Sequence, residues 1–420
     1  MLTLGCKLNL ADSDSIASRL AGAGFDVTGH LCEADGYVLN TCSVTHVADR
    51  KSRRLIRSVR RLAPAAQIVV TGCFPRAAGA EAAAALGADL VVGTSPADHD
   101  AVAEHLARRC RRDQPAHRDP DRLPGVLRTR GFVKAQEGCN DVCAFCIVPR
   151  TRGSERSRSV AEVTADVTAA AEAGAREVVI TGTQLGAWGR DLPETLQPAD
   201  LVAGILERSE IPRIRFSSLQ PQDITPRLLA LWRDPRLMPH FHLALQSGSD
   251  QVLAAMRRRY TAGEFAAAAG RIAAVVPGAA ITTDVIVGFP GESEADFAAT
   301  LALCTEVGFA RIHAFPYSVR SRTAAARLPG QVSPAVKRER MDRILALGEV
   351  LADGFGSMFL GTVRPVLWEE TAAGPGGAEW AGYTDNYLRV RAPGADLLNR
   401  ITPARLVAQE GGLIAAEVAA

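Results

Sequence analysis

Three cysteines lie close together near the middle of the chain, in the segment EGCNDVCAFCIVPRTRG. They are Cys139, Cys143 and Cys146, separated by three and then two residues. Three thiolates in one loop can bind three irons of a [4Fe–4S] cube and leave the fourth iron open. An open iron can chelate the amino and carboxylate groups of S-adenosylmethionine. One electron then breaks the S–C5′ bond and releases a 5′-deoxyadenosyl radical, and the cofactor supplies this chemistry.

The alternative for these three cysteines is a zinc site. Zinc sites usually have four protein ligands, often arranged as two separate pairs. No fourth partner lies near Cys139, Cys143 and Cys146 in the sequence. The spacing therefore favours an iron–sulfur cluster over zinc.

A second set of three cysteines is spread over the first 73 residues. Cys6, Cys42 and Cys73 end the segments LTLGC, YVLNTC and IVVTGC, and each follows a predicted strand. In a doubly wound sheet the loops after parallel strands converge on one crevice, so three distant thiolates can meet there. A single cysteine at a strand end is more often a small buried hydrophobe, but three at matched positions predict a second cluster with an open iron.

The other cysteines and the histidines carry no such pattern. Cys304 continues an apolar stripe at helical spacing, and neither Cys32 nor Cys110 has a partner motif. His240 and His242 alternate on one predicted strand and could line a barrel, without being ligands. Nine cysteines in a long chain whose start lacks signal-peptide features point to metal binding or catalysis and not to disulfides.

The elements that position the second set form a predicted doubly wound α/β domain over residues 1–112. Its strands are expected near Leu2–Gly5, Phe25–Thr28, Tyr37–Asn40, Gln67–Thr71 and Ala88–Val92. Residues 113–127, rich in Pro and Asp, are predicted to be a linker.

Residues 128–357 are predicted to form a partial (β/α)6 barrel. Its six strands are expected at FVKAQ, EVVITGT, RIRFSSLQ, HFHLALQ, ITTDVIVGF and RIHAFPY. Two of the helices between them should begin with capping boxes, at Ser159-x-x-Glu162 and Ser293-x-x-Asp296. In such a barrel the active site lies at the carboxyl ends of the strands, and the loop of Cys139 follows the first strand.

Residues 358–420 change character, with short β-rich runs separated by Gly, Asn and Asp turns. They predict a small antiparallel β-barrel, a fold that often binds oligonucleotides. Trp380, Tyr383 and Tyr387 either stack on single-stranded bases or fill this barrel, and the sequence favours neither.

Charge and composition set the remaining limits. The 420 residues are 47% hydrophobic with a formal net charge of +2, which is close to balanced. Basic residues crowd two stretches, Arg50–Arg61 and Arg150–Arg158, and both adjoin cysteine motifs, so a polyanionic partner is plausible. No run of about 18 apolar residues is present, so we expect no membrane span and a cytoplasmic protein.

The spacing of Cys139, Cys143 and Cys146, the aromatic Phe145 before the third cysteine, and the six-unit barrel resemble the radical S-adenosylmethionine superfamily. The resemblance implies that residues near later strand ends line the cofactor pocket. With Phe145, these are Gly182 and Thr183 of the TGT loop, Ser217, Gln246 and Gly288. Ser217 and Gln246 could equally be ordinary polar residues of the barrel interior.

The two cysteine sets, the barrel and the β-rich tail together resemble the methylthiotransferase family along the whole chain. HFHLALQSGSDQVLAAMRRRYT, ITTDVIVGFPGESEADF and IHAFPYSVRSRT are similar to its signatures, and the tail looks like its RNA-binding TRAM domain. The resemblance implies two [4Fe–4S] clusters, S-adenosylmethionine, and a reductive electron donor such as flavodoxin or ferredoxin; it does not indicate the sulfur donor. It also implies that one S-adenosylmethionine methylates sulfur at the auxiliary cluster. A second is cleaved to a radical that takes hydrogen from C2 of an adenine, to which the methylthio group then bonds.

Branches of this family differ after the first cysteine. GCKLN, with Lys7-Leu8-Asn9, resembles the branch that acts on N6-threonylcarbamoyladenosine beside the tRNA anticodon. The isopentenyladenosine branch tends to have Gln-Met there, and the ribosomal protein S12 branch has Pro-Lys. Those two substrates remain alternatives, as does a non-catalytic iron–sulfur protein that binds RNA. Val319–Arg322 departs from the Pro- and Gly-containing sequence of relatives.

Overall fold

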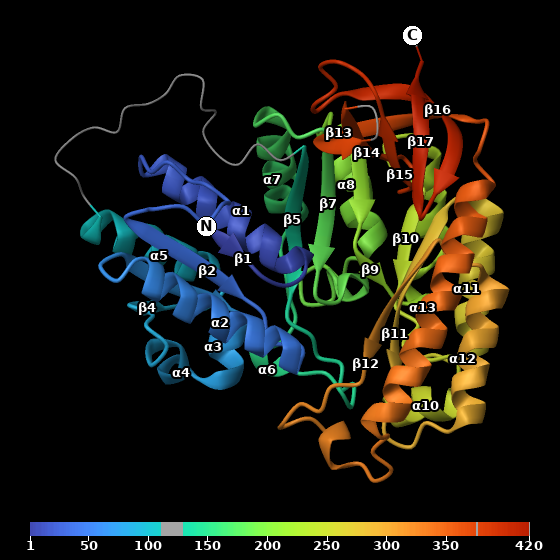
Figure 1. Ribbon diagram of the computed structural model, residues 1–420, viewed down its shortest axis with the longest axis horizontal. Coiled ribbons are helices and arrows are strands. Elements are labelled where there is room, and N and C mark those ends of the chain that lie inside the picture. Colours follow the sequence, from blue (N-terminus) through green and yellow to red (C-terminus); the bar gives the residue numbers. More distant parts are fainter. Residues whose placement is uncertain (111–128, 375–376, 420) are drawn as a thin grey trace.

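The computed structural model describes residues 1–110, 129–374 and 377–419 (Figure 1). The predicted linker 113–127 lies outside the described residues. None of the helices within the described ranges is long and apolar enough to cross a membrane.

The N-terminal domain is a parallel four-stranded sheet with helices on both faces. Its strands run side by side in the order β1 (Leu2–Thr3), β2 (Gly36–Thr41), β3 (Gln67–Gly72) and β4 (Leu90–Val91). Its helices are α1 (Lys7–Gly22), α2 (His46–Leu62), α3 (Cys73–Ala78), α4 (Ala80–Ala84) and α5 (Pro96–Arg109). Alternate strand residues face opposite layers: Val38 and Val69 pack towards α1 and α5, and Leu39, Ile68 and Val70 towards α2.

One predicted strand of this domain is wrong. Residues 25–28 have no strand geometry, although Phe25 and Val27 pack against the same cluster as Val38. The amino group of Met1 donates to the carbonyl of Thr28 at 2.7 Å, but no ladder of backbone hydrogen bonds joins the segment to β1. The apolar alternation therefore reflects packing on the core without pairing in the sheet.

The central domain contains the six predicted parallel strand units. They are β5 (Arg130–Glu137), β7 (Glu177–Gly182), β8 with β9 (Arg213–Phe216 and Ser218–Leu219), β10 (His240–Leu243), β11 (Ala280–Val287) and β12 (Arg311–Pro316). β8 pairs with β7 and β9 pairs with β10, so the third unit joins two halves at Ser217. A short strand, β6 (Arg156–Ser157), is antiparallel to β5 at the edge.

Most helices of the central domain cover the outside of these strands, whereas α6 (Val148–Arg152) lies beside α3 of the N-terminal domain (Figure 1). The others are α7 (Val160–Glu172), α8 (Pro198–Arg208), α9 (Pro226–Leu229), α10 (Asp250–Ala255), α11 (Ala262–Val275), α12 (Glu294–Val307) and α13 (Pro334–Ser357). Short 3-10 turns occur at Leu185–Ala187, Pro221–Asp223, Ala230–Arg233 and Ala325–Arg327. Both predicted capping boxes are present, at the starts of α7 and α12, and Cys304 is fully buried in the core as expected.

Strand alternation divides the outside of this partial barrel from its lumen. On β5, Val133 and Ala135 pack in the large core with the helices, so Lys134 and Gln136 face the lumen. At the other edge of the partial barrel, Asp284 of β11 lies opposite His313 of β12, and both belong to the lumen face. The predicted lining role of His240 and His242 agrees with this, because both bond to Thr282 Oγ1, at 3.1 and 3.0 Å.

The C-terminal domain is a closed five-stranded barrel. Its strands are β13 (Val363–Gly374), β14 (Gly377–Thr384), β15 (Arg389–Ala392), β16 (Ile401–Glu410) and β17 (Leu413–Val418). The pairs are antiparallel, as predicted, apart from β15 with β17, which is parallel. Trp368 and Leu406 are among the side chains that fill it.

This small barrel covers the amino-terminal ends of the central strands (Figure 1). Arg215 donates to the carbonyls of Thr384 and Asp385 at 2.9 and 2.8 Å, and Tyr387 stacks on His240 with ring centroids 4.4 Å apart. Tyr383 stacks in turn on Tyr387. These two tyrosines therefore lie between the small barrel and the central domain. They do not fill the small barrel, and they are not on an open surface where RNA bases could stack.

Candidate active site

The loop of Cys139 follows β5 at the carboxyl end of the barrel. Gly138 has φ +77°, and a Cβ there would lie 1.9 Å from the carbonyl oxygen of Ser154, so only glycine allows this turn. The Cys139 amide donates to the Gly153 carbonyl at 3.0 Å. The loop is thus fixed before its sulfur atoms bind anything.

Two of the sulfurs in this loop accept backbone hydrogen bonds. The Asp141 amide donates to Cys139 Sγ and the Val148 amide to Cys146 Sγ, each at 3.4 Å. Burial nevertheless raises the pKa of Cys139 to about 11 and that of Cys146 to about 12. A bound metal replaces such protons, so these sulfurs suit metal ligation better than nucleophilic chemistry.

The third sulfur of this loop has a cationic neighbour. Arg258 Nη1 donates to Cys143 Sγ at 3.3 Å, and its Nη2 donates to Gln220 Oε1 at 3.0 Å. Arg258 lies within MRRRYT, the end of one of the signatures recognised in the sequence. Its contact with Cys143 could not be predicted from the sequence, because the two residues are far apart in the chain. Hydrogen bonds to ligand sulfurs adjust the potential of an iron–sulfur cluster.

The second cysteine set meets where the predicted loops converge. Cys6 caps α1, Cys42 follows β2, and Cys73 begins α3 directly after β3. A Cβ at Gly5 would lie 3.0 Å from Cys42 Cβ, and one at Gly72 would lie 2.3 Å from the Thr41 carbonyl oxygen. These glycines allow the loops to approach, as the matched strand-end positions predicted.

An asparagine pair holds two of these loops together. Asn9 Nδ2 donates to the carbonyls of Leu4 and Thr41, at 2.9 and 3.1 Å, and to Asn40 Oδ1 at 2.9 Å. Asn40 Nδ2 returns a bond to the Asn9 carbonyl at 2.8 Å. Cys42 and Cys73 are buried and Cys6 is exposed, so the set opens on the side of Cys6.

A buried arginine connects the two cysteine sets. Arg152 ends α6, six residues after Cys146, and is 2% exposed. Its Nε donates to Cys73 Sγ at 3.3 Å, its Nη1 to Asp12 and Glu137 at 2.6 and 2.7 Å, and its Nη2 to Asn9 at 2.8 Å. The same loop therefore carries one set and contacts the other.

The charges around Arg152 form a closed network. Lys134 Nζ bonds to Asp12 Oδ1 at 2.5 Å and pairs with Glu137 at 3.3 Å. Although burial opposes ionisation, Lys134 and Arg152 hold the pKa of Glu137 at about 2. The carboxylate is thus ionised at neutral pH and keeps Arg152 aimed at Cys73.

The second basic stretch, Arg150–Arg158, is largely paired within the protein. Arg152 is buried, and Arg158 pairs with Asp166 at 2.6 Å and donates to the Lys134 carbonyl at 3.0 Å. Arg156 remains exposed but pairs with Glu137 at 3.3 Å. Three of the four arginines in Arg150–Arg158 therefore have acidic partners elsewhere in the sequence, which leaves less of their charge for a polyanion.

The polar residues expected to line the cofactor pocket lie around the lumen. Thr183 Oγ1 and Ser217 Oγ are buried without a hydrogen-bond partner among the described residues. Gln246 has φ +67° and its backbone bridges to β11. Buried hydroxyls without a partner fit a polar ligand such as S-adenosylmethionine.

The three other predicted pocket residues have contacts within the protein. The Gly288 amide already donates to Glu292 Oε2 at 2.7 Å, so its N–H is not free for a ligand. Phe145, within the cysteine loop, packs edge-on against Phe289 with ring centroids 6.5 Å apart. Gly182 ends β7 and approaches Gln136, where a Cβ would lie 3.0 Å from Oε1.

The donor sets fit clusters of several irons. Each cysteine of such a set binds a different iron, so the sulfurs need not converge on one point. Within residues 1–110, 129–374 and 377–419, no three His, Cys, Asp or Glu side chains are close enough to share a single ion. Both sets offer three thiols, and an arginine donates to one sulfur of each, which suits a cluster with one open iron.

Comparison with known proteins agrees with this geometry. Residues 1–93 match Uncharacterized protein family UPF0004, and residues 133–304 match the Radical SAM superfamily. The chain is 37% identical to threonylcarbamoyladenosine tRNA methylthiotransferase MtaB of Bacillus subtilis, over 96% of this chain and 92% of that protein. It is 34% identical to the Thermotoga maritima protein of the same name, over 92% and 89%. The chain belongs to the radical S-adenosylmethionine methylthiotransferases.

Membership confirms the predicted family, the enzyme class and the cofactors. This methylthiotransferase uses S-adenosylmethionine and two [4Fe–4S] clusters. Among solved structures, the radical S-adenosylmethionine methyltransferase TsrM of Kitasatospora setae is similar, with a TM-score of 0.54, 14% identity, and coverage of 73% of this chain and 69% of that one. At that identity the likeness supports the fold alone, which is the predicted one.

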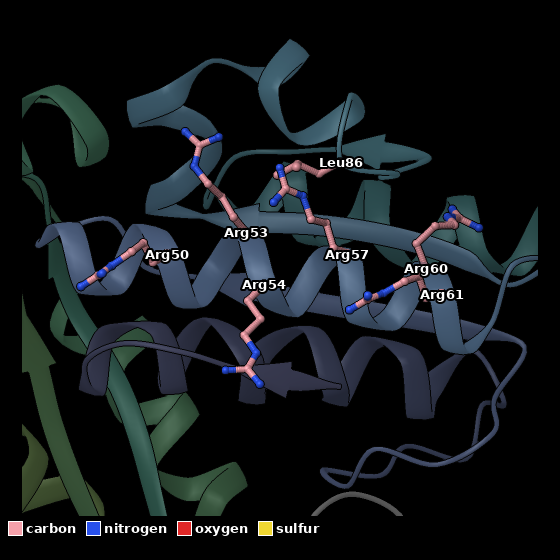
Figure 2. Close-up of a pocket in the computed structure, with 7 residues that line it drawn as sticks. All are labelled: Arg50, Arg53, Arg54, Arg57, Arg60, Arg61 and Leu86. Atoms are coloured by element: carbon pink, nitrogen blue, oxygen red, sulfur yellow. The ribbon is translucent and has the colours of Figure 1, made fainter.

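The first basic stretch differs from the second. Arg50, Arg54, Arg57 and Arg61 on α2 are exposed, and none has a hydrogen bond or ion pair with another described residue. Arg60 is the exception, because it bonds to the Gly87 carbonyl and pairs with Asp89. The arginines and Leu86 line a hollow of about 540 Å³. Figure 2 shows the arginine side chains projecting from α2 in several directions. We name this face of α2, formed by Arg50, Arg54, Arg57 and Arg61, the α2 arginine surface.

Proposed function

We propose that this methylthiotransferase acts on N6-threonylcarbamoyladenosine beside the anticodon of tRNA and forms 2-methylthio-N6-threonylcarbamoyladenosine. The observation that carries the proposal is near-full-length similarity to two proteins named for that nucleoside. In the reaction, the C2–H bond of the adenine is replaced by a C2–S bond, and the sulfur carries a methyl group from S-adenosylmethionine. The target carbon has no acidic proton, so a radical route is needed.

In this proposal each cysteine set holds one cluster. Cys139, Cys143 and Cys146 bind the cluster that cleaves S-adenosylmethionine, and Cys6, Cys42 and Cys73 bind the auxiliary cluster. When bound, the first supplies an electron for radical formation and the second an open iron for sulfur. Arg258 and Arg152 position one sulfur of each set, through their bonds to Cys143 and Cys73.

The chain's other residues bind and orient. The buried hydroxyls of Thr183 and Ser217 are suited to hold S-adenosylmethionine at the carboxyl ends of β7 and β8. The N-terminal domain reaches across the open side of the barrel, where Arg320 bonds to Asp49 and Ser43 at 2.6 and 2.9 Å. This covering excludes water from a radical, which would otherwise be quenched.

The α2 arginine surface is suited to bind the phosphates of the RNA. Its four guanidiniums have no partner among the described residues, and they lie on the domain that holds the auxiliary set. A base in a loop is unpaired and can leave the stack at lower cost than a paired one. The reductant is expected to be a flavodoxin or ferredoxin of the cytoplasm.

Reconstitution and product analysis test the proposal. Anaerobically reconstituted protein should hold about eight irons, and replacement of either cysteine set by alanine should remove about half. Loss of Cys139, Cys143 and Cys146 should abolish formation of 5′-deoxyadenosine. Loss of Cys6, Cys42 and Cys73 should leave that formation intact and stop methylthio transfer.

Nucleoside mass spectrometry then decides the substrate. With tRNA carrying N6-threonylcarbamoyladenosine, the intact enzyme should yield the 2-methylthio product. If it instead modifies isopentenyladenosine or ribosomal protein S12, the enzyme class stands and the proposed substrate is wrong.

A further inference from the structure

The loop that carries Cys139, Cys143 and Cys146 has an open outer face. Val142, which directly precedes Cys143, is 67% exposed, and Cys143 itself is half-buried. Another protein can therefore reach this face and touch a residue that is next to a cluster ligand in the chain.

Two segments of the central domain flank the loop. The Ala144 amide donates to the Met256 carbonyl at 2.9 Å, and the Ala144 carbonyl accepts from the Ala325 amide at 2.8 Å. Met256 directly follows α10, and Ala325 begins the 3-10 turn after β12. The loop therefore lies between the carboxyl end of α10 and this turn.

Both flanking segments carry exposed arginines. Arg257 directly follows Met256, and Arg327 is two residues after Ala325. Both side chains are exposed, and neither has a hydrogen bond or an ion pair with another described residue. Two unpaired guanidiniums thus extend from backbone that is hydrogen-bonded, or within two residues of being hydrogen-bonded, to the loop.

A third arginine contacts the loop directly. Arg259 pairs with Asp141 at 2.7 Å, and its own side chain is 58% exposed while Asp141 is largely buried. Within residues 139–146, 256–259 and 320–327, the exposed charged residues are all arginines, namely Arg257, Arg259, Arg322 and Arg327. We name Val142, Arg257, Arg259 and Arg327 the cluster-loop surface.

One exposed carboxylate stands at the margin of this surface. Glu155 Oε1 accepts from the Asn140 amide at 3.2 Å, at the start of the loop. It offsets only part of the positive charge, because Arg257 and Arg327 have no acidic partner among the described residues. The surface therefore attracts a negatively charged partner.

We propose that the cluster-loop surface is the docking site of a small acidic protein that carries one electron to the enzyme. The inference rests on the proposed function, which needs an external reductant. The carrier loses one electron, and the cluster bound by Cys139, Cys143 and Cys146 gains it, as cleavage of the S–C5′ bond requires. An apolar residue among unpaired cations is complementary to an acidic protein surface.

The outer face of the loop is also the approach that the reaction leaves free. In the proposed function the lumen holds S-adenosylmethionine and the target base, so a carrier has to approach from outside the barrel. A protein seated on Val142 touches the neighbour of Cys143. Redox encounters use small interfaces, below about 1,200 Å² in total, so one loop and its two flanking segments suffice.

RNA phosphates are the alternative occupant of an arginine-rich surface. The α2 arginine surface lies on the N-terminal domain, at the left of Figure 1, whereas α10 lies at the lower right. The cluster-loop surface also contains exposed Val142 and has Glu155 at its margin. Phosphates favour uninterrupted positive charge, whereas protein interfaces combine apolar and charged groups, so the observations favour a protein.

Two reductants separate docking from chemistry. Reconstituted holoenzyme and the charge-reversed double variant Arg257→Glu with Arg327→Glu are supplied either with reduced flavodoxin, a small acidic carrier, or with dithionite, which needs no docking site. Formation of 5′-deoxyadenosine is measured without tRNA. Affinity of each holoenzyme for oxidised flavodoxin is measured separately, by microscale thermophoresis at several salt concentrations.

We expect the double variant to form 5′-deoxyadenosine about tenfold more slowly with flavodoxin at low salt, and at the wild-type rate with dithionite. Its affinity for oxidised flavodoxin should fall and should depend less on salt. Val142→Ser should cause a smaller loss in the flavodoxin reaction alone. The charge-conserving double variant Arg257→Lys with Arg327→Lys should keep most of the wild-type rate.

The matched control reverses two exposed arginines elsewhere, Arg271→Glu on α11 with Arg338→Glu on α13, and should keep both rates. Iron content and thermal unfolding of each variant show whether it folds and binds its clusters.

Three results overturn the assignment. An equal loss with both reductants shows that Arg257 and Arg327 support the cluster and not a carrier. An unchanged rate with flavodoxin shows that the carrier docks elsewhere, and if tRNA affinity falls in that variant the surface binds RNA. If the wild-type enzyme forms 5′-deoxyadenosine with dithionite but never methylthiolates threonylcarbamoyladenosine, the proposed function is wrong and the docking assignment stands on its own readout.

Discussion

Arg152 Nε lies 3.3 Å from Cys73 Sγ, so a residue of the Cys139 loop completes the surroundings of the other cysteine set. The contact crosses from the central domain to the N-terminal domain, between α6 and α3. Because α6 begins two residues after Cys146, we expect a displacement of the Cys139 loop to reach Cys73 as well.

Replacing Arg152 by glutamine should lower the reduction potential of the auxiliary cluster, because a charged donor to a ligand sulfur is lost. It should also reduce the free energy of unfolding by about 3–5 kcal/mol, since buried Asp12 and Glu137 lose a cationic partner. A redox titration followed by electron paramagnetic resonance measures the potential, in a background where Cys139, Cys143 and Cys146 are alanine.

The matched control is Arg156→Gln, because Arg156 also pairs with Glu137 but its side chain is 55% exposed. It should change stability by less than about 1 kcal/mol and leave the potential unaltered. An unchanged potential in fully loaded Arg152→Gln protein would contradict the positioning role of Arg152.

Glu137→Gln should make the free energy of unfolding less dependent on pH in the acid range. The pKa of Glu137 is about 2 in the folded protein and near the ordinary value of 4.5 in the unfolded chain. The carboxylate therefore contributes about 3 kcal/mol above pH 5, and this contribution is lost as pH falls towards 2. Urea unfolding at pH 7, 5, 4 and 3 should show a gap between wild type and variant that narrows with acid. The control is Glu172→Gln at an exposed position, whose free energy of unfolding should match that of the wild type at every pH. A difference between wild type and Glu137→Gln that does not change with pH would contradict the lowered pKa of Glu137.

Replacing Arg54, Arg57 and Arg61 together by glutamine should weaken tRNA binding and reduce its salt dependence. Each phosphate contact that is lost lowers the slope of log affinity against log salt by about 0.7–0.9, so three should lower it by about 2–3. Filter binding at several salt concentrations measures this. The control is a triple variant of exposed arginines elsewhere, Arg233, Arg271 and Arg338. Equal slopes for both triple variants would exclude the α2 arginine surface as the RNA site.

Tyr387→Phe should destabilise the protein by about 1 kcal/mol and Tyr387→Ala by about 3–5 kcal/mol, with little change in tRNA affinity. The phenylalanine loses the bond from Arg130 at 3.1 Å, and the alanine also loses the stacking on His240. Thermal unfolding and filter binding give the two readouts. A large loss of affinity at unchanged stability would return Tyr387 to the role of an RNA-stacking residue.

The sequence predicted those features that depend on local pattern. Cys6, Cys42 and Cys73 could be grouped because each follows an apolar β-rich run, and parallel strands bring such ends together. The six strand units and both capping boxes could also be predicted, because they depend on residues that are close together in the sequence. Phe25 and Val27 misled the strand prediction, because alternation records burial on one side and not hydrogen bonding to a neighbour.

Residues that act across domains could not be found in this way. Arg152 read as part of a basic surface because Asp12, Asn9 and Glu137 are distant in sequence, and only the folded chain shows that they surround it. A buried cation needs buried anions, and nothing in local spacing tells which carboxylates these are. Tyr387 likewise could not be assigned before its contact with His240 was known.

The small barrel at the amino-terminal ends of the strands limits how the substrate and the cofactor can reach the lumen. Contacts of Arg215 and Tyr387 cover that end of the lumen, and α1 lies against its side. Entry is therefore expected at the carboxyl ends of the strands. The nucleoside, the spent cofactor fragments and fresh S-adenosylmethionine then share one route. We therefore expect bound RNA to hinder the exchange of S-adenosylmethionine and its products.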